Sequence, residues 1–189
     1  MSYTILITFF PPFDGKTKNI SKTIAHLVYD LIKKQQKFLN VCIYVKEIPV
    51  IPPEKVQKNL IKYLEKYNPD LVLLFGETYY KTCVEKYANA KWQDIGWEDY
   101  YGGEEKTLVT SANPHWKNVQ PFCNTIGNYS CSLAYYTALD YSIKYNKTQE
   151  TVFIHINMNL QQKGLQHLAE KILHATISSR GGDTYTAPL

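Results

Sequence analysis

The sequence has few of the features that mark membrane-bound, disulfide-rich or zinc-binding proteins. It contains four cysteines, none of them in a CxxC pair, and no group of histidines completes a zinc pattern. The apolar run near the start follows no basic segment, is too short to span a membrane, and is broken by Pro11 and Pro12. We therefore expect no membrane partner, no metal, and a cytoplasmic protein with reduced thiols.

Charge of one sign is not concentrated anywhere in the chain. The net charge of +4 comes from 21 Lys and Arg against 17 Asp and Glu, and the lysines are spread along the sequence. Such a scattered excess is typical of a solvated surface, so no nucleic-acid partner is expected. The 189 residues show no repeat, low-complexity segment or linker, which predicts a single domain over 1–189.

The first part of the chain alternates apolar strands with amphipathic helices. Continuous apolar, β-branched runs predict strands, and apolar residues at i, i+3, i+4 and i+7 predict helices. In order, the segments are a strand over 3–10, a helix over 21–34, a strand over 40–50, a helix over 52–67 and a strand over 70–76. Strands without polar alternation indicate a parallel sheet covered on both faces. We expect an α/β fold, a three-layer sandwich with a mostly parallel twisted sheet flanked by helices.

The second part of the chain is less regular. It predicts strands near 84–88, 106–110 and 121–123, a helix over 131–145, a strand over 151–157, a helix over 160–177 and a loose tail over 178–189. Sites in open α/β sheets form at the carboxyl ends of strands. Three stretches come there: Phe10 and Phe13, Glu77, and the segment 124–131.

Cys131 ends that last segment, "NTIGNYSC", where a Gly/Asn turn leads into a helix. A helix start offers partial positive charge and free N–H groups, which favour a nucleophilic thiolate and can hold an oxyanion. On these residues alone, a small packed side chain in the first helical turn is the more ordinary explanation. Both interpretations stay open.

His155 is the best candidate for a base, because it lies inside the apolar strand "TVFIHIN". A buried imidazole needs a hydrogen-bond partner, which is either a backbone carbonyl or a nucleophile such as Cys131. A third group would orient the ring. Glu85 and Glu77 are the two best carboxylates for this role, and spacing does not choose between them.

Several segments, taken in order, resemble a known family. "ILITFFPPFDG", "KEIPV" and "YNPDLVLLFG" are followed by "EKYANA", "NTIGNYSCS" and "FIHIN". The last three are similar to E-R-V-A-I-N, N-T-A-G-T-Y-x-C-N and F-I-H-I-P of pyroglutamyl peptidase I, the pyrrolidone-carboxylate peptidases, which are cysteine peptidases. The resemblance covers nearly the whole chain and implies a phosphorylase/hydrolase-like α/β fold.

The resemblance also implies roles for individual residues. Cys131 would be the nucleophile, His155 the base and Glu85 the third member of a triad that needs no cofactor. The substrate would be a peptide or small amide, held by Phe10, Phe13, Asn19, Glu77 and Trp92. Phe10 and Phe13 would wall a flat five-membered lactam, and Asn19 or Glu77 would bond its amide. The aromatic surplus suits a pocket or a subunit interface equally, so a homo-oligomer is left open.

Departures from the family pattern gather around the expected substrate. The family's G-Q-A-G-G-R loop reads "GETYYK" here, with Glu77 in place of Gln. A carboxylate accepts a hydrogen bond from a lactam N–H but cannot donate one to the lactam C=O. "AKWQD" places Trp92 at a pocket position, and Asn157 replaces the final Pro of F-I-H-I-P. We therefore expect a pyroglutamyl exopeptidase, with two alternatives: a related hydrolase or acyl-transfer enzyme of changed acyl specificity, or a non-catalytic binding relative.

Overall fold

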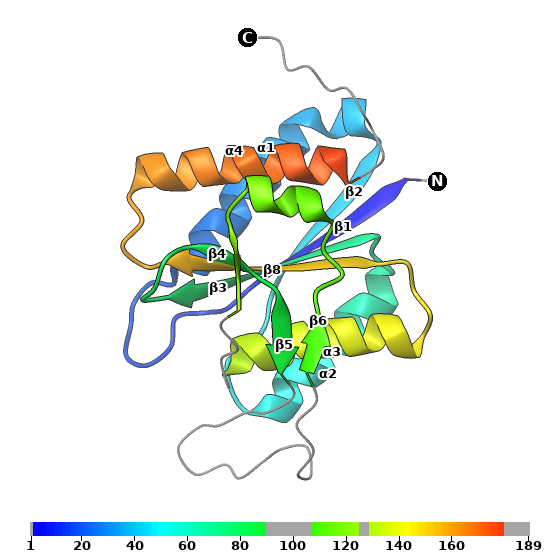
Figure 1. The fold of residues 1–189 in the computed structure, drawn as a ribbon, viewed down its shortest axis with the longest axis horizontal. Coiled ribbons are helices and arrows are strands. Elements are labelled where there is room, and N and C mark those ends of the chain that lie inside the picture. The colour runs from blue at the N-terminus through cyan, green and yellow to red at the C-terminus, as the bar shows by residue number, and fades with distance from the viewer. Residues whose placement is uncertain (1, 90–106, 125–128, 180–189) are drawn as a thin grey trace.

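The computed structural model describes residues 2–89, 107–124 and 129–179. Its centre is a six-stranded sheet of order β2-β1-β3-β8-β4-β7 (Figure 1). These strands are β1 (Tyr3–Phe9), β2 (Val41–Glu47), β3 (Leu71–Thr78), β4 (Cys83–Glu85), β7 (Phe122–Cys123) and β8 (Glu150–Asn157). Neighbours are parallel except at β4 and β8, which are antiparallel. The mostly parallel sheet expected from the sequence is confirmed.

Helices cover both faces of this sheet and complete the three layers. Helices α1 (Ile20–Leu39) and α4 (Gln162–Ser178) lie on one face, and α2 (Pro53–Tyr67) and α3 (Ser130–Lys144) lie on the other (Figure 1). The alternation of strand residues divides the core accordingly. In β8, Ile154 and Ile156 pack in the α1/α4 layer, whereas Phe153 packs in the α2/α3 layer.

The helices begin and end at residues suited to those positions. Asn19 caps α1 by accepting a hydrogen bond from the Ser21 N–H, and Pro53 occupies the first turn of α2. Asn40 and Asn68 follow α1 and α2 at φ values of 45° and 39°. Asn tolerates this left-handed backbone better than most residues, so it ends a helix cleanly.

One strand expected from the sequence is in fact two. The segment 84–88 was predicted as a single strand, but the chain changes partner within it. After β4 it leaves the large sheet, and β5 (Tyr87–Asn89) pairs antiparallel with β6 (Thr107–Val109) in a separate two-stranded sheet packed against α3. Hydrophobic periodicity indicates that a segment is a buried strand but not which strand it pairs with, so the sequence pattern does not reveal the change of partner. A short 3-10 helix, η1 (Pro114–Asn118), precedes β7.

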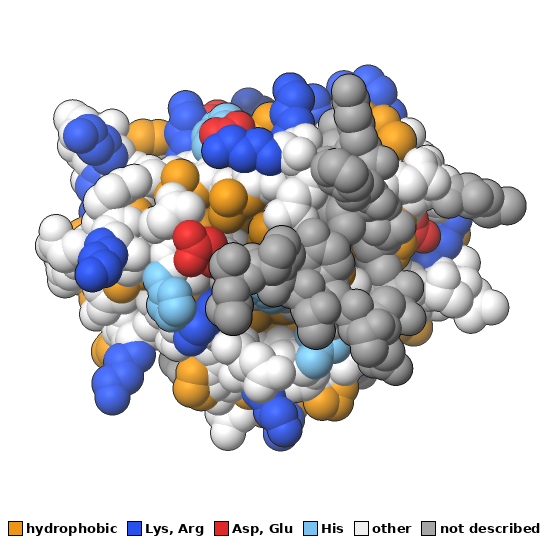
Figure 2. All heavy atoms as spheres, turned by 90° about the horizontal axis from the view of Figure 1, so that it is seen from above, with side chains coloured by type: hydrophobic (Ala, Val, Ile, Leu, Met, Phe, Trp, Pro, Cys, Tyr) orange, Lys and Arg blue, Asp and Glu red, His pale blue; other side chains and the backbone are white. Residues whose placement is uncertain are grey.

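The end of the chain and its surface are simple to describe. Helix α4 reaches Ser178, the first residue of the predicted loose tail, and 180–189 lie outside the described residues. No helix in the described part of the chain combines the length and the apolar character needed to cross a membrane. On the face shown in Figure 2, the Lys and Arg side chains are separated by uncharged ones rather than gathered into one patch.

Candidate active site

Cys131 lies in the first turn of α3, at a helix start that is fixed on two sides. Ser130 Oγ donates to the carbonyl of Val50 at 2.5 Å. Ser132 Oγ accepts from the N–H of Asn89 at 2.9 Å and donates to its carbonyl at 3.1 Å. These hydrogen bonds hold the first turn of α3 in place, and with it the partly buried Cys131. The predicted Gly127–Asn128 turn before it lies outside the described residues.

His155 projects from β8 into a space that a glycine leaves open. Gly76 of β3 pairs with His155 in the parallel register. A Cβ atom at Gly76 would lie 2.7 Å from the Phe153 ring and 3.0 Å from Cδ2 of His155. The missing side chain therefore makes room for both rings, which meet edge to face with centroids 4.8 Å apart.

Glu85 meets His155 across the antiparallel pair of β4 and β8. The His155 Nδ1–H donates to Glu85 Oε1 over 2.5 Å, and the Glu85 side chain is only 5% exposed. Charged hydrogen bonds of this kind are short and orient an imidazole firmly. Of the two carboxylates that spacing left open, the structure brings Glu85 to the ring.

The pKa of His155 depends on its burial and on the two neighbouring side chains, Cys131 and Glu85. Burial disfavours the charged ring and by itself lowers the pKa of His155. The neighbouring side chains of Cys131 and Glu85 outweigh that effect and raise the pKa of His155 to about 9. His155 thus interacts with Cys131 and with Glu85, which is the order in which a nucleophile, its base and an orienting carboxylate are arranged.

Tyr135 is a part of the site that the sequence reasoning missed. It lies one helical turn after Cys131 in α3, is fully buried, and donates its hydroxyl to the Glu85 carbonyl at 3.2 Å. Burial raises the pKa of this phenol, so it stays protonated and remains a donor. Tyr135 thereby ties the helix of Cys131 to the strand of Glu85. The i, i+4 spacing from Cys131 was the available signal.

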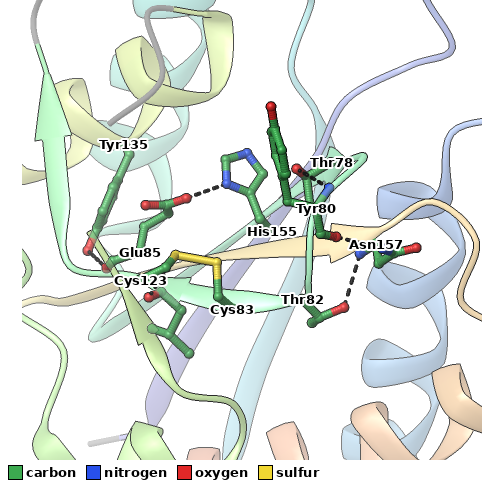
Figure 3. The surroundings of a disulfide bond; sticks show 10 residues. Thr78, Tyr80, Thr82, Cys83, Glu85, Cys123, Tyr135, His155 and Asn157 are labelled. Carbon is green, nitrogen blue, oxygen red and sulfur yellow. Dashed lines mark hydrogen bonds and ion pairs between the residues drawn. A yellow bond between two sulfur atoms is a disulfide. The ribbon is translucent and has the colours of Figure 1, made fainter. Parts of the chain in front are cut away.

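A disulfide between Cys83 and Cys123 lies next to the Glu85–His155 pair (Figure 3). It joins β4 to β7, with Cα atoms 5.8 Å apart. The expectation that all thiols are reduced is therefore wrong for these two, and Cys42 and Cys131 are the free cysteines of the described residues. The cysteines of the bridge are 40 positions apart, and only strand pairing makes them neighbours.

Three residues predicted to bind substrate, Phe10, Phe13 and Asn19, lie between β1 and α1. Phe10 is buried in the α2/α3 layer, whereas Phe13 is 37% exposed. Asn19 is buried, with Nδ2 donating to the Pro11 carbonyl and Oδ1 accepting from both the N–H and the hydroxyl of Ser21. Trp92 lies outside the described residues. The substrate-binding roles of these residues stay predictions.

Glu77 lies on the opposite face of the sheet from His155. Because it follows Phe75 at a spacing of two residues, its side chain points to the α1/α4 layer. Its Oε1 accepts from Lys16 Nζ at 2.5 Å, and its Oε2 accepts from the N–H of Ile20 at 3.1 Å. This hydrogen bond raises the pKa of Lys16. Both oxygens are engaged by the protein, and the predicted contact of Glu77 with substrate stays a prediction.

Two segments that depart from the family pattern are hydrogen-bonded to each other. Asn157, in the place of the family's Pro, donates through Nδ2 to the Tyr80 carbonyl at 2.6 Å. Its backbone N–H, which a proline lacks, donates to Thr82 Oγ1 at 3.0 Å. The "GETYYK" segment is thus fastened to the end of β8, and the rings of Tyr79 and Tyr80 remain 71% and 76% exposed.

Comparisons with known proteins agree with this geometry at the level of the fold. No family model and no curated protein matches the chain. A mutant pyrrolidone carboxyl peptidase from the hyperthermophile Pyrococcus furiosus is similar at 18% identity and a TM-score of 0.75, over 94% of this chain and 98% of that one.

Two further solved structures are similar over nearly their whole length. Pyroglutamyl peptidase I from Bacillus amyloliquefaciens has 20% identity and a TM-score of 0.71, covering 95% of this chain and 96% of that one. The pyrrolidone carboxyl peptidase from Thermococcus litoralis has 20% identity and a TM-score of 0.67, covering 99% and 100%. From end to end, the chain has the fold of the pyrrolidone carboxyl peptidases.

Proposed function

We propose that the protein is a cysteine hydrolase that removes an N-terminal pyroglutamyl group from peptides or small amides. The observation that carries the proposal is the connected set of Cys131, His155 and Glu85 at the start of a helix. A reactive thiol needs a base within hydrogen-bond reach and a third group that orients the base. The fold shared with the pyrrolidone carboxyl peptidases also supports the proposal of a cysteine hydrolase.

In the first half of the reaction, Cys131 attacks the acyl carbonyl. His155 takes the thiol proton, and the resulting thiolate forms a bond to the carbonyl carbon. N–H groups in the first turn of α3 have no partners within the helix, so they can stabilise the oxyanion. His155 then gives its proton to the leaving amine, and a thioester on Cys131 remains.

In the second half, water releases the acyl group. His155 removes a proton from water, the hydroxide attacks the thioester, and the thiol of Cys131 leaves with that proton. Glu85 keeps Nδ1 protonated, so Nε2 is the nitrogen that faces Cys131 and exchanges protons. Besides water, these steps use three side chains of this protein and the backbone N–H groups at the start of α3.

A second candidate keeps the same chemistry but acts on a different small N-acyl or amide group. It is favoured by Glu77, whose two oxygens are occupied by Lys16 and Ile20. A carboxylate held in this way is poorly placed to replace the family's Gln in bonding a lactam. The exposed Tyr79 and Tyr80 add bulk where the family has glycine.

Hydrolysis of a pyroglutamyl-linked chromogenic amine tests the first proposal. We expect turnover by the parent chain and none by Cys131→Ser, with both proteins folded by circular dichroism. Turnover of another N-acyl amide in place of the pyroglutamyl compound would support the second candidate. Full turnover by Cys131→Ser would contradict both.

Alkylation by iodoacetamide separates an enzyme from a binding relative without a known substrate. The chain offers two free thiols, so Cys42→Ser provides the matched control. We expect Cys131 to be modified much faster than Cys42 near neutral pH, and His155→Ala to abolish the difference. Equal rates at both cysteines would favour a protein without catalytic function.

A further inference from the structure

Within the part of the chain that the structure describes, one oxygen of the Glu85 carboxylate has no hydrogen-bond partner. Oε1 accepts from His155, but Oε2 is buried and is the only side-chain nitrogen or oxygen of this kind that the described residues leave without a hydrogen bond. A buried carboxylate oxygen with nothing to bind loses the full free energy of its hydration. Such an atom therefore points to a ligand that completes it.

The two sulfur atoms of the disulfide lie beside this carboxylate. Sγ of Cys83, Sγ of Cys123 and a carboxylate oxygen of Glu85 are all within 4.8 Å of one another. Strand register places all of them on the face of His155, because Cys83 pairs with His155 and Cys123 pairs with Glu85. Figure 3 shows the bridge directly beneath the Glu85–His155 contact.

We propose that, once the disulfide is reduced, Cys83, Cys123 and Oε2 of Glu85 bind a thiophilic divalent cation such as Zn²⁺. Two thiolates and a carboxylate are a ligand set that zinc accepts, with solvent as the fourth ligand of a tetrahedron. Both cysteines are partly exposed, so solvent, a reductant and the ion can reach them.

Conversion of the disulfide into a metal site takes two steps, reduction of the S–S bond and binding of the cation. A phosphine or dithiol reductant supplies two electrons, two protons enter, and the S–S bond becomes two thiols. The cation then displaces both thiol protons as it binds. At Zn–S distances of about 2.3 Å the two sulfurs lie about 3.8 Å apart, which side-chain rotation can reach from Cα atoms at 5.8 Å.

Glu85 would interact differently in the two forms. With the disulfide formed, its carboxylate binds His155. With the metal bound, Oε2 ligates the cation while Oε1 stays within reach of His155 Nδ1. A hydrogen bond from His155 to a ligating carboxylate holds that ligand in its orientation.

Cadmium titration tests the site directly, using the ultraviolet charge-transfer absorption of thiolate–cadmium bonds. The parent for this test is Cys42→Ser combined with Cys131→Ser, in which Cys83 and Cys123 are the remaining cysteines. We expect one Cd²⁺ per chain after reduction by a phosphine and none before it. This result is independent of the proposed hydrolase function, since the parent lacks its nucleophile.

Two variants define the ligands. Cys83→Ser is expected to remove the charge-transfer band of a two-thiolate site, and Glu85→Gln to weaken cadmium binding at least tenfold. Absence of stoichiometric binding by the reduced parent, or unchanged affinity in either variant, would overturn the proposal.

A measurement on the unmodified sequence covers the case in which a variant fails to fold. Under reducing conditions, Zn²⁺ should slow alkylation of Cys83 and Cys123 at least tenfold and leave Cys42 unaffected, as read by peptide mass spectrometry. Equal protection of Cys42, or no protection of the pair, counts against the site.

Discussion

Two buried carboxylates lie near the same end of the central strands, on opposite faces of the sheet. Glu77 is the next-to-last residue of β3 and points into the α1/α4 layer, whereas Glu85 ends β4 and lies on the face covered by α3. Each side chain is 5% exposed, and each accepts a 2.5 Å hydrogen bond from a group that can be positively charged, Lys16 or His155. Their surroundings are otherwise different.

The difference lies in how completely each carboxylate is satisfied. Glu77 uses one oxygen for Lys16 and the other for the first N–H of α1. Glu85 uses one oxygen for His155, and among the described residues its other oxygen has no hydrogen bond. A fully satisfied carboxylate fastens a loop to a strand, whereas a half-satisfied one beside a titratable ring is available for chemistry.

The largest expected effect comes from neutralising the carboxylate beside His155. Glu85→Gln keeps the shape of the side chain but removes the charge that orients the ring, so we expect kcat to fall by about 10³- to 10⁴-fold. Steady-state kinetics on the substrate identified as above provides the measurement. The matched control is Glu77→Gln, where we expect a smaller loss that falls on stability or KM; equal losses of kcat would erase the distinction between the two residues.

Next in size is the effect of opening the bridge beside Glu85. The Cys83–Cys123 bond spans 40 residues, and reduction should lower the free energy of unfolding by about 4 kcal/mol through loop-closure entropy. Urea unfolding with and without a phosphine, in the presence of a chelator, measures this. A Cys83→Ser/Cys123→Ser double variant should not respond to the phosphine, and a comparable response there would rule out the bridge as the cause.

On the Glu77 side the expected loss is one of stability. Lys16→Met leaves Glu77 buried with the Ile20 N–H as its remaining partner, so we expect the free energy of unfolding to fall by about 1–3 kcal/mol. Lys33→Met, which removes an exposed lysine from the middle of α1, serves as the control and should change little. Thermal unfolding of the two variants side by side decides the point, and identical curves would contradict it.

The smallest expected effect tests how α3 supports Glu85. Tyr135→Phe deletes the hydroxyl that binds the Glu85 carbonyl, which should cost about 1 kcal/mol of stability and lower kcat a few-fold with KM unchanged. Tyr63→Phe deletes a comparable hydroxyl bonded to the carbonyl of Glu47, far from His155 in the fold, and is the control. A change in KM instead of kcat would show that Tyr135 does not act by positioning Glu85.

Much of the large sheet could be predicted because its strands are buried and continuously apolar. β1, β3 and β8 follow from continuous apolar runs, and α1 and α2 follow from hydrophobic periodicity, although α1 continues to Leu39 where the pattern predicted an end at 34. The contact of His155 with Glu85 could not be derived this way, because it depends on β4 entering the sheet antiparallel to β8. The resemblance to a known family was needed to prefer Glu85 over Glu77.

The disulfide and the hydrogen bonds of Glu77 could not be predicted from the sequence, for a related reason. Cys83 and Cys123 become neighbours only through the short strands at the sheet edge, and no spacing rule connects them. The two oxygens of Glu77 are occupied by the loop before α1 and by its first residues, which sequence periodicity does not place. Contacts between distant, irregular segments are therefore what the structure adds.

Gly76 has a consequence for how this protein tolerates mutation. It forms no part of the reaction, yet a methyl group there would press on Phe153 and His155. In a saturation screen for activity Gly76 should score with Cys131 and His155, although every replacement would still leave the proposed catalytic residues in the sequence. A survey of mutational tolerance would thus report one residue more than the proposed chemistry uses, and that residue would contribute room for two rings rather than a functional group.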